Sequence, residues 1–448
     1  MPNGKIDEGW TVGRWRIALL LGAMAIIVYL PSLGLPLISD DYPHTYLARQ
    51  YGPVSGWPAL ASDALYRCRA TSLILTYWTE RAFGLNPLAF HLTGLGLHVL
   101  NVWLIFALGF WKVIGWRHSA VAAGFFAIHE GLQEAVIWYA AIHELIHFTF
   151  ALLCVHCWLR WLASGSRKLY LGAFTAFVLA LLSKESAVVL VPLMVLLAVV
   201  DRRDWRRAVV FVLPFAVLAV AYFLLVYSAR ATHLHFNDVG TFSLSAPFWI
   251  TLRNSTGRLF WIWGWLSVAA LLAWRPAGRG WLVALGAAWA VLCLLPYSFL
   301  TYMPRVPSRH TYLAAMGLAL VVSAAFWRVQ ERFSKRPWVG WALVSVIFVH
   351  NCAYIWIVKQ AQFLERAAPT ERLVQFAAGV EGPVYIHCFP YGMESAVRAV
   401  EMRLGKDAYA MLSERSLSEI QDRSNVFCWT PNEHWSRHPV TAGAGSLK

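Results

Sequence analysis

Eleven apolar runs constrain the fold of this chain more than any other feature. A helix of about 20 apolar residues is long enough to cross a bilayer. Only 14% of the 448 residues are charged, against about 25% in a soluble domain. The sequence therefore predicts an all-α polytopic membrane protein with about eleven transmembrane helices, at 15–35, 87–110, 119–129, 143–163, 169–182, 187–200, 207–228, 257–273, 281–297, 311–327 and 338–358.

The distribution of Lys and Arg predicts how the chain is oriented. With the N-terminus in the cytoplasm, the inward connections hold 18 Lys and Arg in 57 residues, whereas the outward connections hold 9 in 111. Because cytoplasmic connections are enriched in these residues, we expect a cytoplasmic N-terminus and an extracytoplasmic C-terminus, in a bacterial-type inner (plasma) membrane. We also expect the first run to be retained, since no small-x-small cleavage pattern follows it. The net charge of +14 lies in short clusters between apolar runs, so nucleic-acid binding is not expected.

The composition changes after the last apolar run. Residues 1–358 are predicted to form the transmembrane catalytic domain, and residues 359–448 a small extracytoplasmic α/β domain with a frayed tail from 435. The alternation of apolar residues predicts two strands and two amphipathic helices in this domain, at 383–388, 425–429, 394–404 and 408–420.

Two cysteines of this region, Cys388 and Cys428, lie on the predicted outer side of the membrane. A disulfide is permitted there. Spacing alone does not establish connectivity, so their pairing stays open.

The acidic pair Asp40-Asp41 follows the first apolar run directly. Adjacent carboxylates at the mouth of a membrane helix are costly to place and are usually functional, although a helix cap followed by a surface turn is the structural alternative. No charged residue lies near the centre of a predicted span, and the other polar candidates share the outward side with this pair. They are His44, Arg67, Arg69, His129, Glu130, Glu134, His143, Glu144, Lys184, Glu185, Arg305, Arg309 and His310.

This one-sided distribution predicts an enzyme that acts on a membrane-anchored substrate. Cations such as Arg69, Lys184 and Arg309 suit the phosphate of a lipid-linked donor, and Asp41 or Asp40 suits the general base that an attacking hydroxyl needs. The second Asp could orient the first, bind the acceptor, or ligate Mg²⁺ or Mn²⁺. A transporter would place its polar groups near the bilayer midplane, so a flippase or transporter of a lipid-linked glycan is kept as the alternative.

Each of these cations could instead have a purely structural role. Arg67 and Arg69 could lie at the interface with their charged ends in water, Lys184 and Glu185 could form a local ion pair, and Arg309 could anchor a helix end.

A competing motif is His143-Glu144-Leu145-Ile146-His147, which matches H-E-x-x-H. On a helix this spacing places two His on one face as zinc ligands, with the Glu as base. An intramembrane zinc protease is therefore a lesser alternative, for which no third ligand is evident in a later span.

Several blocks of residues occur in a fixed order along the chain. They are 39–42 (S-D-D-Y), 84–92 with His98 and Asn101 (G-L-N-P-L-A-F-H-L), 126–138 (F-A-I-H, then E-A-V-I-W), 181–185 (L-L-S-K-E) and 308–313 (S-R-H-T-Y-L). Together these blocks resemble the GT-C glycosyltransferases that use polyprenyl- or dolichyl-phosphate sugars, in particular the transmembrane-and-TPR protein O-mannosyltransferases and their PMT-like bacterial relatives. In that alignment Arg69 falls at the Arg of the family's R-P-L motif, with Ala70 and Thr71 in place of Pro and Leu.

The resemblance implies transfer of one sugar, with inversion, from a polyprenyl-phosphate donor to an acceptor hydroxyl outside the membrane. It implies that Asp41 or Asp40 is the base. We favour Asp41, because it is further from the apolar run and so freer to meet an acceptor. It also implies that Arg69, Lys184 and Arg309 bind the donor phosphate. The residues expected to line the cavity are Arg67, His129, Glu134, Glu144 and Glu185.

The chain departs from the family pattern at two positions and in its C-terminal region. Glu130 replaces the Pro after His129, and Ile142 stands where the family has Arg. No TPR repeats follow the last span, so the acceptor could be a glycan, a lipid or a protein.

Overall fold

The computed structural model describes residues 12–201, 205–229, 231, 242–243, 245–274, 280–300, 307–411 and 425–429. All eleven predicted apolar runs form helices, which confirms the all-α polytopic fold. These helices are α1 (Val12–Tyr29), α5 (Pro87–Ala107), α6 (Gly115–Ile128), α8 (Ile142–Ser164), α9 (Arg167–Leu181), α10 (Leu190–Val200), α11 (Trp205–Ser228), α12 (Phe248–Ala273), α13 (Gly280–Leu294), α14 (Ala315–Arg332) and α15 (Trp338–Ala353).

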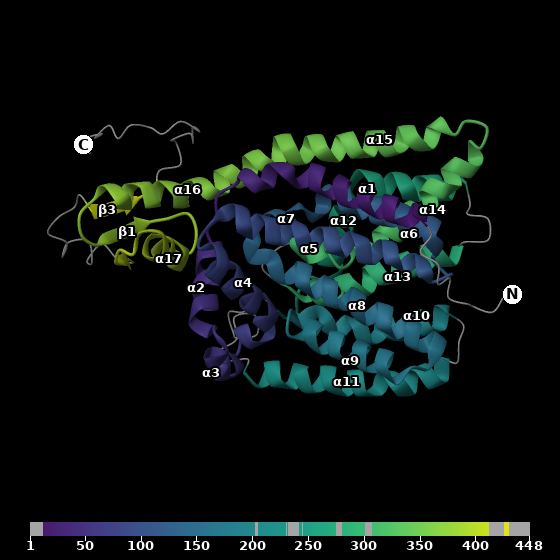
Figure 1. The fold of residues 1–448 in the computed structure, drawn as a ribbon, viewed down its shortest axis with the longest axis horizontal. Coiled ribbons are helices and arrows are strands. Elements are labelled where there is room, and N and C mark those ends of the chain that lie inside the picture. Colours follow the sequence, from purple (N-terminus) through teal and green to yellow (C-terminus); the bar gives the residue numbers. More distant parts are fainter. Residues whose placement is uncertain are drawn as a thin grey trace.

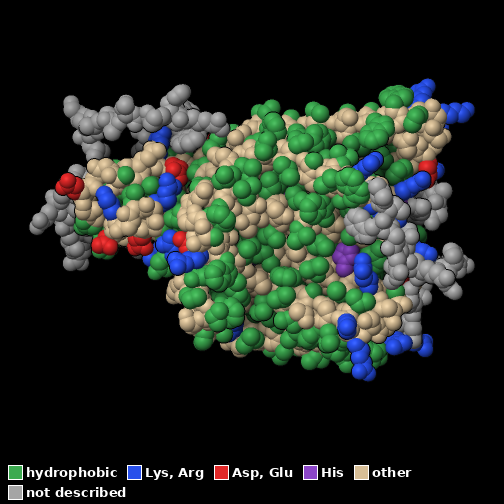
Figure 2. All heavy atoms as spheres, in the orientation of Figure 1, with side chains coloured by type: hydrophobic (Ala, Val, Ile, Leu, Met, Phe, Trp, Pro, Cys, Tyr) green, Lys and Arg blue, Asp and Glu red, His purple; other side chains and the backbone are tan. Residues whose placement is uncertain are grey.

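Seven helical stretches in the described part of the chain are long and apolar enough to cross a membrane. Among the predicted spans, α6, α9 and α10 are helices of only 14, 15 and 11 residues, well below the roughly 20 residues of a straight crossing. Helix α8 is buried on all sides, between α5, α9 and α10. In contrast, α1, α11 and α15 expose apolar side chains on the outside of the bundle (Figure 2). This apolar surface is what a protein embedded in lipid requires.

The long connections at one end of the bundle are themselves helical. They form α2 (Asp41–Tyr51), α3 (Trp57–Ser62), α4 (Ala70–Phe83) and α7 (Gln133–Ile137), joined by short 3₁₀ turns. Helices α2 and α4 pack together through a small apolar cluster of Ala48, Tyr51, Leu60 and Leu73. Since α2 begins at Asp41, this packing fixes the acidic pair at the end of the bundle (Figure 1).

The C-terminal region is continuous with the bundle. Helix α15 runs through a π-helical turn, Tyr354–Lys359, into α16 (Gln360–Gly379), so one helical stretch passes through the predicted boundary at 358/359 without a break. A parallel three-stranded sheet then forms in the order β2-β1-β3, with α17 (Met393–Leu404) connecting its first two strands. The strands are β1 (Val384–Cys388), β2 (Ala408–Ala410) and β3 (Val426–Cys428).

The small α/β fold of this region is as predicted, with one error. The predicted helix at 408–420 begins instead as strand β2, because Ala408 is buried beside Val384 of β1 while Tyr409 is exposed. The rest of that predicted helix, and the predicted frayed tail, lie outside the described residues. Cys388 and Cys428, whose pairing the sequence leaves open, form a disulfide that joins β1 to β3.

Helix α17 lies beside α2 at the end of the bundle (Figure 1). The C-terminal unit therefore covers the place where the acidic pair lies.

Candidate active site

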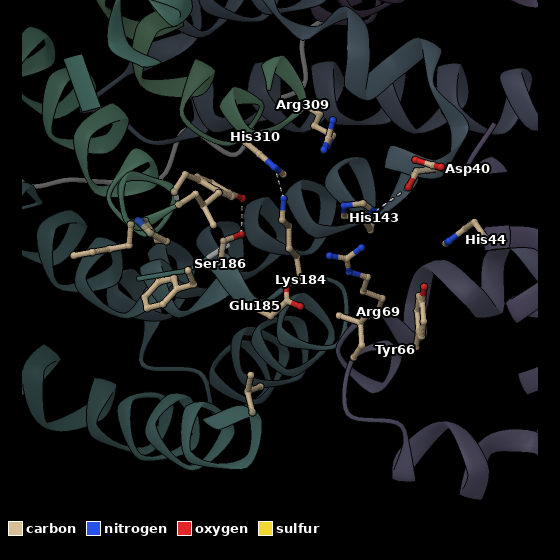
Figure 3. Close-up of a pocket in the computed structure, with 18 of the residues that line it drawn as sticks. Asp40, His44, Tyr66, Arg69, His143, Lys184, Glu185, Ser186, Arg309 and His310 are labelled. Carbon is tan, nitrogen blue, oxygen red and sulfur yellow. Dashed lines mark hydrogen bonds between the residues drawn. The ribbon is translucent and has the colours of Figure 1, made fainter. Parts of the chain in front are cut away.

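A cavity of about 770 Å³ lies where the bundle meets the C-terminal unit. Its polar wall brings together side chains from four separate segments, among them Asp40, Arg69, Lys184 and Arg309 (Figure 3). Its other wall is apolar and is formed by Val188, Tyr222, Phe223, Val226, Phe242, Leu295, Phe299 and Leu300. A ligand with one charged end and one hydrocarbon end would match the two walls.

The two acidic residues have opposite environments. Asp41, the first residue of α2, is fully buried: its Oδ2 accepts the N–H of Ile38 at 2.7 Å and its Oδ1 that of Ala140 at 2.6 Å. Burial raises the pKa of Asp41 to about 7, although the two backbone hydrogen bonds oppose this. Asp41 therefore ties the start of α2 to the segment before α8 and does not line the cavity.

Asp40 is exposed and lines the cavity. Ser39 before it adopts a positive φ of 37°, an uncommon conformation for a residue with a Cβ. Asp40 is the N-cap of α2 and has helical dihedral angles. Successive helical residues point about 100° apart, so the two carboxylates face different sides. Oδ1 of Asp40 accepts hydrogen bonds from Ser395 Oγ at 3.1 Å and Ser39 Oγ at 3.3 Å. The expectation that Asp41 is the freer of the two to meet an acceptor is wrong, because Asp41 is the buried one.

Arg69 ends a 3₁₀ turn, Tyr66–Arg69, and its side chain points into the cavity (Figure 3). Among the described residues its guanidinium has no ion-pair partner, and its buried Nε has no hydrogen-bond partner. Other buried polar atoms also lack a partner, Nε of Arg67 among them, so what distinguishes Arg69 is its place on the cavity wall. A bound anion there would pair with its guanidinium.

Lys184 lies on the cavity wall but is already paired. Its buried Nζ donates to Glu144 Oε1, and His310 Nδ1 lies 3.0 Å from Nζ and 2.8 Å from the same carboxylate oxygen. The Nζ also lies 4.8 Å from the centre of the Tyr297 ring. Burial lowers the pKa of Lys184 to about 8, and the Glu144 carboxylate limits this shift.

Arg309 is paired in a similar way. Its Nη1 lies 2.8 Å from Glu134 Oε1, and its guanidinium stacks 4.9 Å from the Trp138 ring. A second guanidinium, that of Arg366 in α16, lies 3.9 Å from the same Glu134 oxygen. Although burial alone would raise it, the pKa of Glu134 is lowered by the charges of Arg309 and Arg366.

The residues predicted to line the cavity divide into three groups. Glu185 lines it. Glu134 and Glu144 lie behind the wall and hold the lining cations Arg309 and Lys184. Arg67 and His129 do neither: Arg67 donates to the carbonyl of Leu225 at 2.9 Å, and His129 is buried in the core with its Nε2 3.2 Å from the carbonyl of Leu259.

The three residues of the H-E-x-x-H motif contact protein groups that would not leave them arranged as zinc ligands. Glu144 is bound to Lys184, His143 Nδ1 lies 3.1 Å from the carbonyl of Ala140, and His147 Nε2 lies 3.5 Å from Ser186 Oγ. Within the described ranges no group of three or more His, Cys, Asp or Glu could hold a metal ion. Protein side chains in this part of the chain therefore do not form a complete zinc site.

Two residues of the C-terminal region, Ser395 and Arg366, lie at the site although nothing in the sequence predicts that they do. Ser395 lies in an amphipathic helix of a region that reads as an appendage, and Arg366 lies beyond the predicted end of the last span. Only the docking of α17 on α2, and the unbroken helix from α15 into α16, bring them to the site.

The chain matches no sequence family and no curated protein sequence. Solved structures do resemble it. ArnT from Cupriavidus metallidurans, bound to undecaprenyl phosphate, superposes with a TM-score of 0.53 at 16% identity, covering 93% of this chain and 90% of ArnT.

The archaeal oligosaccharyltransferase AglB from Archaeoglobus fulgidus, in complex with an inhibitory peptide and a dolichol-phosphate, superposes with a TM-score of 0.54 at 12% identity. That match covers 90% of this chain, which spans 65% of AglB. Both neighbours have the GT-C fold. The chain is therefore an integral membrane protein with a GT-C-like fold.

Proposed function

We propose that the chain is a membrane glycosyltransferase that moves one sugar from a polyprenyl-phosphate carrier to an acceptor hydroxyl. The observation that carries the proposal is one cavity that joins an accessible carboxylate, Asp40, a cation without an ion-pair partner in the described chain, Arg69, and an apolar wall. The bound undecaprenyl phosphate of ArnT and the bound dolichol-phosphate of AglB support a lipid phosphate as the donor class.

The two walls of the cavity assign the two ends of the donor. The first isoprene units would lie against the apolar wall around Tyr222, Phe223 and Phe299, since burial of hydrocarbon is favourable there. The phosphate would lie against Arg69, with Lys184 and Arg309 beside it. Arg is suited to this role because its planar guanidinium can donate two parallel hydrogen bonds to phosphate oxygens.

Asp40 would act as the general base. The acceptor hydroxyl gives its proton to Asp40 while its oxygen bonds to the anomeric carbon. The bond from that carbon to the phosphate oxygen breaks, and its electron pair leaves with the polyprenyl phosphate. Because the phosphate leaves without a proton, a single carboxylate is sufficient, unlike in glycoside hydrolysis, where a second carboxyl group protonates the leaving oxygen. Direct displacement inverts the anomeric configuration.

The cavity would face the outside of the cell. It lies at the end of the bundle that carries the Cys388–Cys428 disulfide, and disulfides persist in oxidising compartments. Lys and Arg gather at the opposite end of the bundle, with a mixture of acidic and basic residues on the C-terminal unit (Figure 2). An excess of Lys and Arg is typical of the cytoplasmic side, which supports a bacterial-type inner membrane orientation with the N-terminus inside.

The test is sugar transfer by the purified full-length protein in liposomes. The donors are undecaprenyl-phosphate-linked hexoses and pentoses carrying a radiolabel in the sugar, and a membrane lipid extract supplies acceptors. We expect one donor to lose its label to an acceptor, and Asp40→Asn to abolish that transfer. Label that crosses the bilayer while still attached to its lipid would indicate a flippase and overturn the proposal.

A further inference from the structure

The C-terminal unit contacts the candidate base directly. Ser395, in the first turn of α17, is 3% exposed, and its Oγ donates to Asp40 Oδ1 at 3.1 Å. Its neighbours Gly392 and Glu394 line the cavity. A buried hydroxyl from a unit that reads as an appendage thus holds the one exposed carboxylate of the acidic pair.

Several contacts fix the position of α17 on α2. The Arg398 guanidinium lies 3.7 Å from the centre of the Tyr46 ring, and Arg403 Nη1 donates to the Tyr42 hydroxyl at 3.0 Å. Arg403 is also paired with Glu371 of α16 at 3.1 Å. Since Tyr42 and Tyr46 lie on α2, which begins directly after Asp40, these contacts set the register that places Ser395 beside Asp40.

The hydrogen bonds to Asp40 also leave one carboxylate oxygen available. Both hydroxyls, from Ser39 and Ser395, donate to Oδ1. Oδ2 makes no hydrogen bond or ion pair with the described residues, so it is open to the proton of an acceptor. An exposed Asp without such contacts would rotate about its side-chain bonds and present the proton-accepting oxygen in many directions.

We infer that the C-terminal α/β unit completes the catalytic centre and that Ser395 is a positioning residue, which orients Asp40 toward the acceptor. This inference rests on the proposed function of the same cavity. It gives the unit a role in catalysis itself, in addition to covering the end of the bundle.

The test compares Ser395→Ala with Ser395→Thr in the full-length protein. The Ala variant loses the hydroxyl, and we expect kcat to fall by about 10- to 100-fold, since a small misplacement of a catalytic group has effects of this size. The KM for the labelled donor and the Kd for undecaprenyl phosphate should change less than about 2-fold, because Ser395 lies on the Asp40 side of the cavity. The Thr variant keeps a hydroxyl and should recover most of kcat.

The matched control is Glu381→Gln. Glu381 belongs to the same C-terminal unit, but its side chain is exposed and does not line the cavity, so this variant should keep the wild-type kcat. Wild-type kcat in Ser395→Ala would overturn the inference. Loss of donor binding in parallel with kcat would also overturn it, since Ser395 would then serve the donor. A protein that transfers no sugar from any donor before substitution would instead overturn the proposed function.

Discussion

Arg69 and Arg67 offer a matched pair with which to test the proposed phosphate site. They lie two residues apart in the same 3₁₀ turn, yet Arg69 points into the cavity and Arg67 donates to the carbonyl of Leu225 at 2.9 Å. Substituting each by Ala removes the same side chain from the same turn. Both variants lose one positive charge, so a difference in their affinity for phosphate reports where the charge lies.

We expect Arg69→Ala to weaken undecaprenyl phosphate binding by about 100-fold. A hydrogen bond to a charged group contributes about 1.5–3 kcal/mol, and loss of one strong contact or two weaker ones amounts to about 3 kcal/mol. At about 1.4 kcal/mol for each factor of ten, this corresponds to roughly two orders of magnitude in Kd. Arg69→Lys keeps the charge but loses the two-pronged geometry, so we expect a decrease of about 10-fold.

The assay is titration of the purified protein with undecaprenyl phosphate in detergent, followed by intrinsic Trp fluorescence. Thermal unfolding of each variant is measured alongside. Arg67→Ala should bind with wild-type affinity. If Arg67→Ala weakens binding as much as Arg69→Ala does, or if Arg69→Ala lowers the unfolding temperature without changing Kd, the assignment of Arg69 to the phosphate is refuted.

Three further predictions follow from the same geometry. Asp40→Asn should abolish transfer and leave thermal unfolding unchanged, whereas Asp41→Asn should lower the unfolding temperature, because an amide has one oxygen to accept the two backbone N–H groups that the carboxylate now accepts. The affinity for undecaprenyl phosphate should fall as the pH rises through about 8, where Lys184 loses its proton, and Lys184→Arg should remove this decrease in a pH titration. Replacing both Cys388 and Cys428 by Ser should destabilise the C-terminal unit by roughly 3–4 kcal/mol, as judged from the closure of a loop of 40 residues, and increase its sensitivity to limited proteolysis.

The helices of the bundle could be predicted because bilayer residence leaves a strong pattern in the sequence. Long apolar runs mark each span, and the Lys and Arg between them favour one orientation. The same pattern was enough to predict that Arg69, Lys184 and Arg309 lie at the same end, since each follows or precedes a span that ends there. Their convergence on one cavity was therefore within reach of sequence reasoning.

The partners of these cations were not within reach. Lys184 and Glu144 are 40 residues apart, and Arg309 and Glu134 are 175 apart. Their pairing depends on how the 3₁₀ turns at the ends of the helices are placed. The sequence also could not distinguish Asp40 from Asp41. If α2 began one residue earlier or later, a different carboxylate would lie inside its first turn and a different one would face the cavity. Ser395 had no signal, because its role depends only on where α17 docks.

The pairing of the cations suggests how the proposed site favours the transition state over the bound donor. A polyprenyl-phosphate sugar is a phosphodiester with one negative charge, whereas the released monoester carries about −1.5 to −2 at neutral pH. In the resting site Glu144 and Glu134 balance Lys184 and Arg309, so of these three cations Arg69 is the one without an ion-pair partner in the described chain. As the bond to the anomeric carbon breaks, charge grows on the phosphate. Lys184 and Arg309, held in place by their carboxylates, can then turn part of their hydrogen bonding toward the leaving group.

Interactions that strengthen only as this charge develops lower the barrier, whereas equal binding of donor and transition state would not. In this view Glu144 and Glu134 act by holding the two cations ready, and their removal should tighten donor binding while it slows transfer.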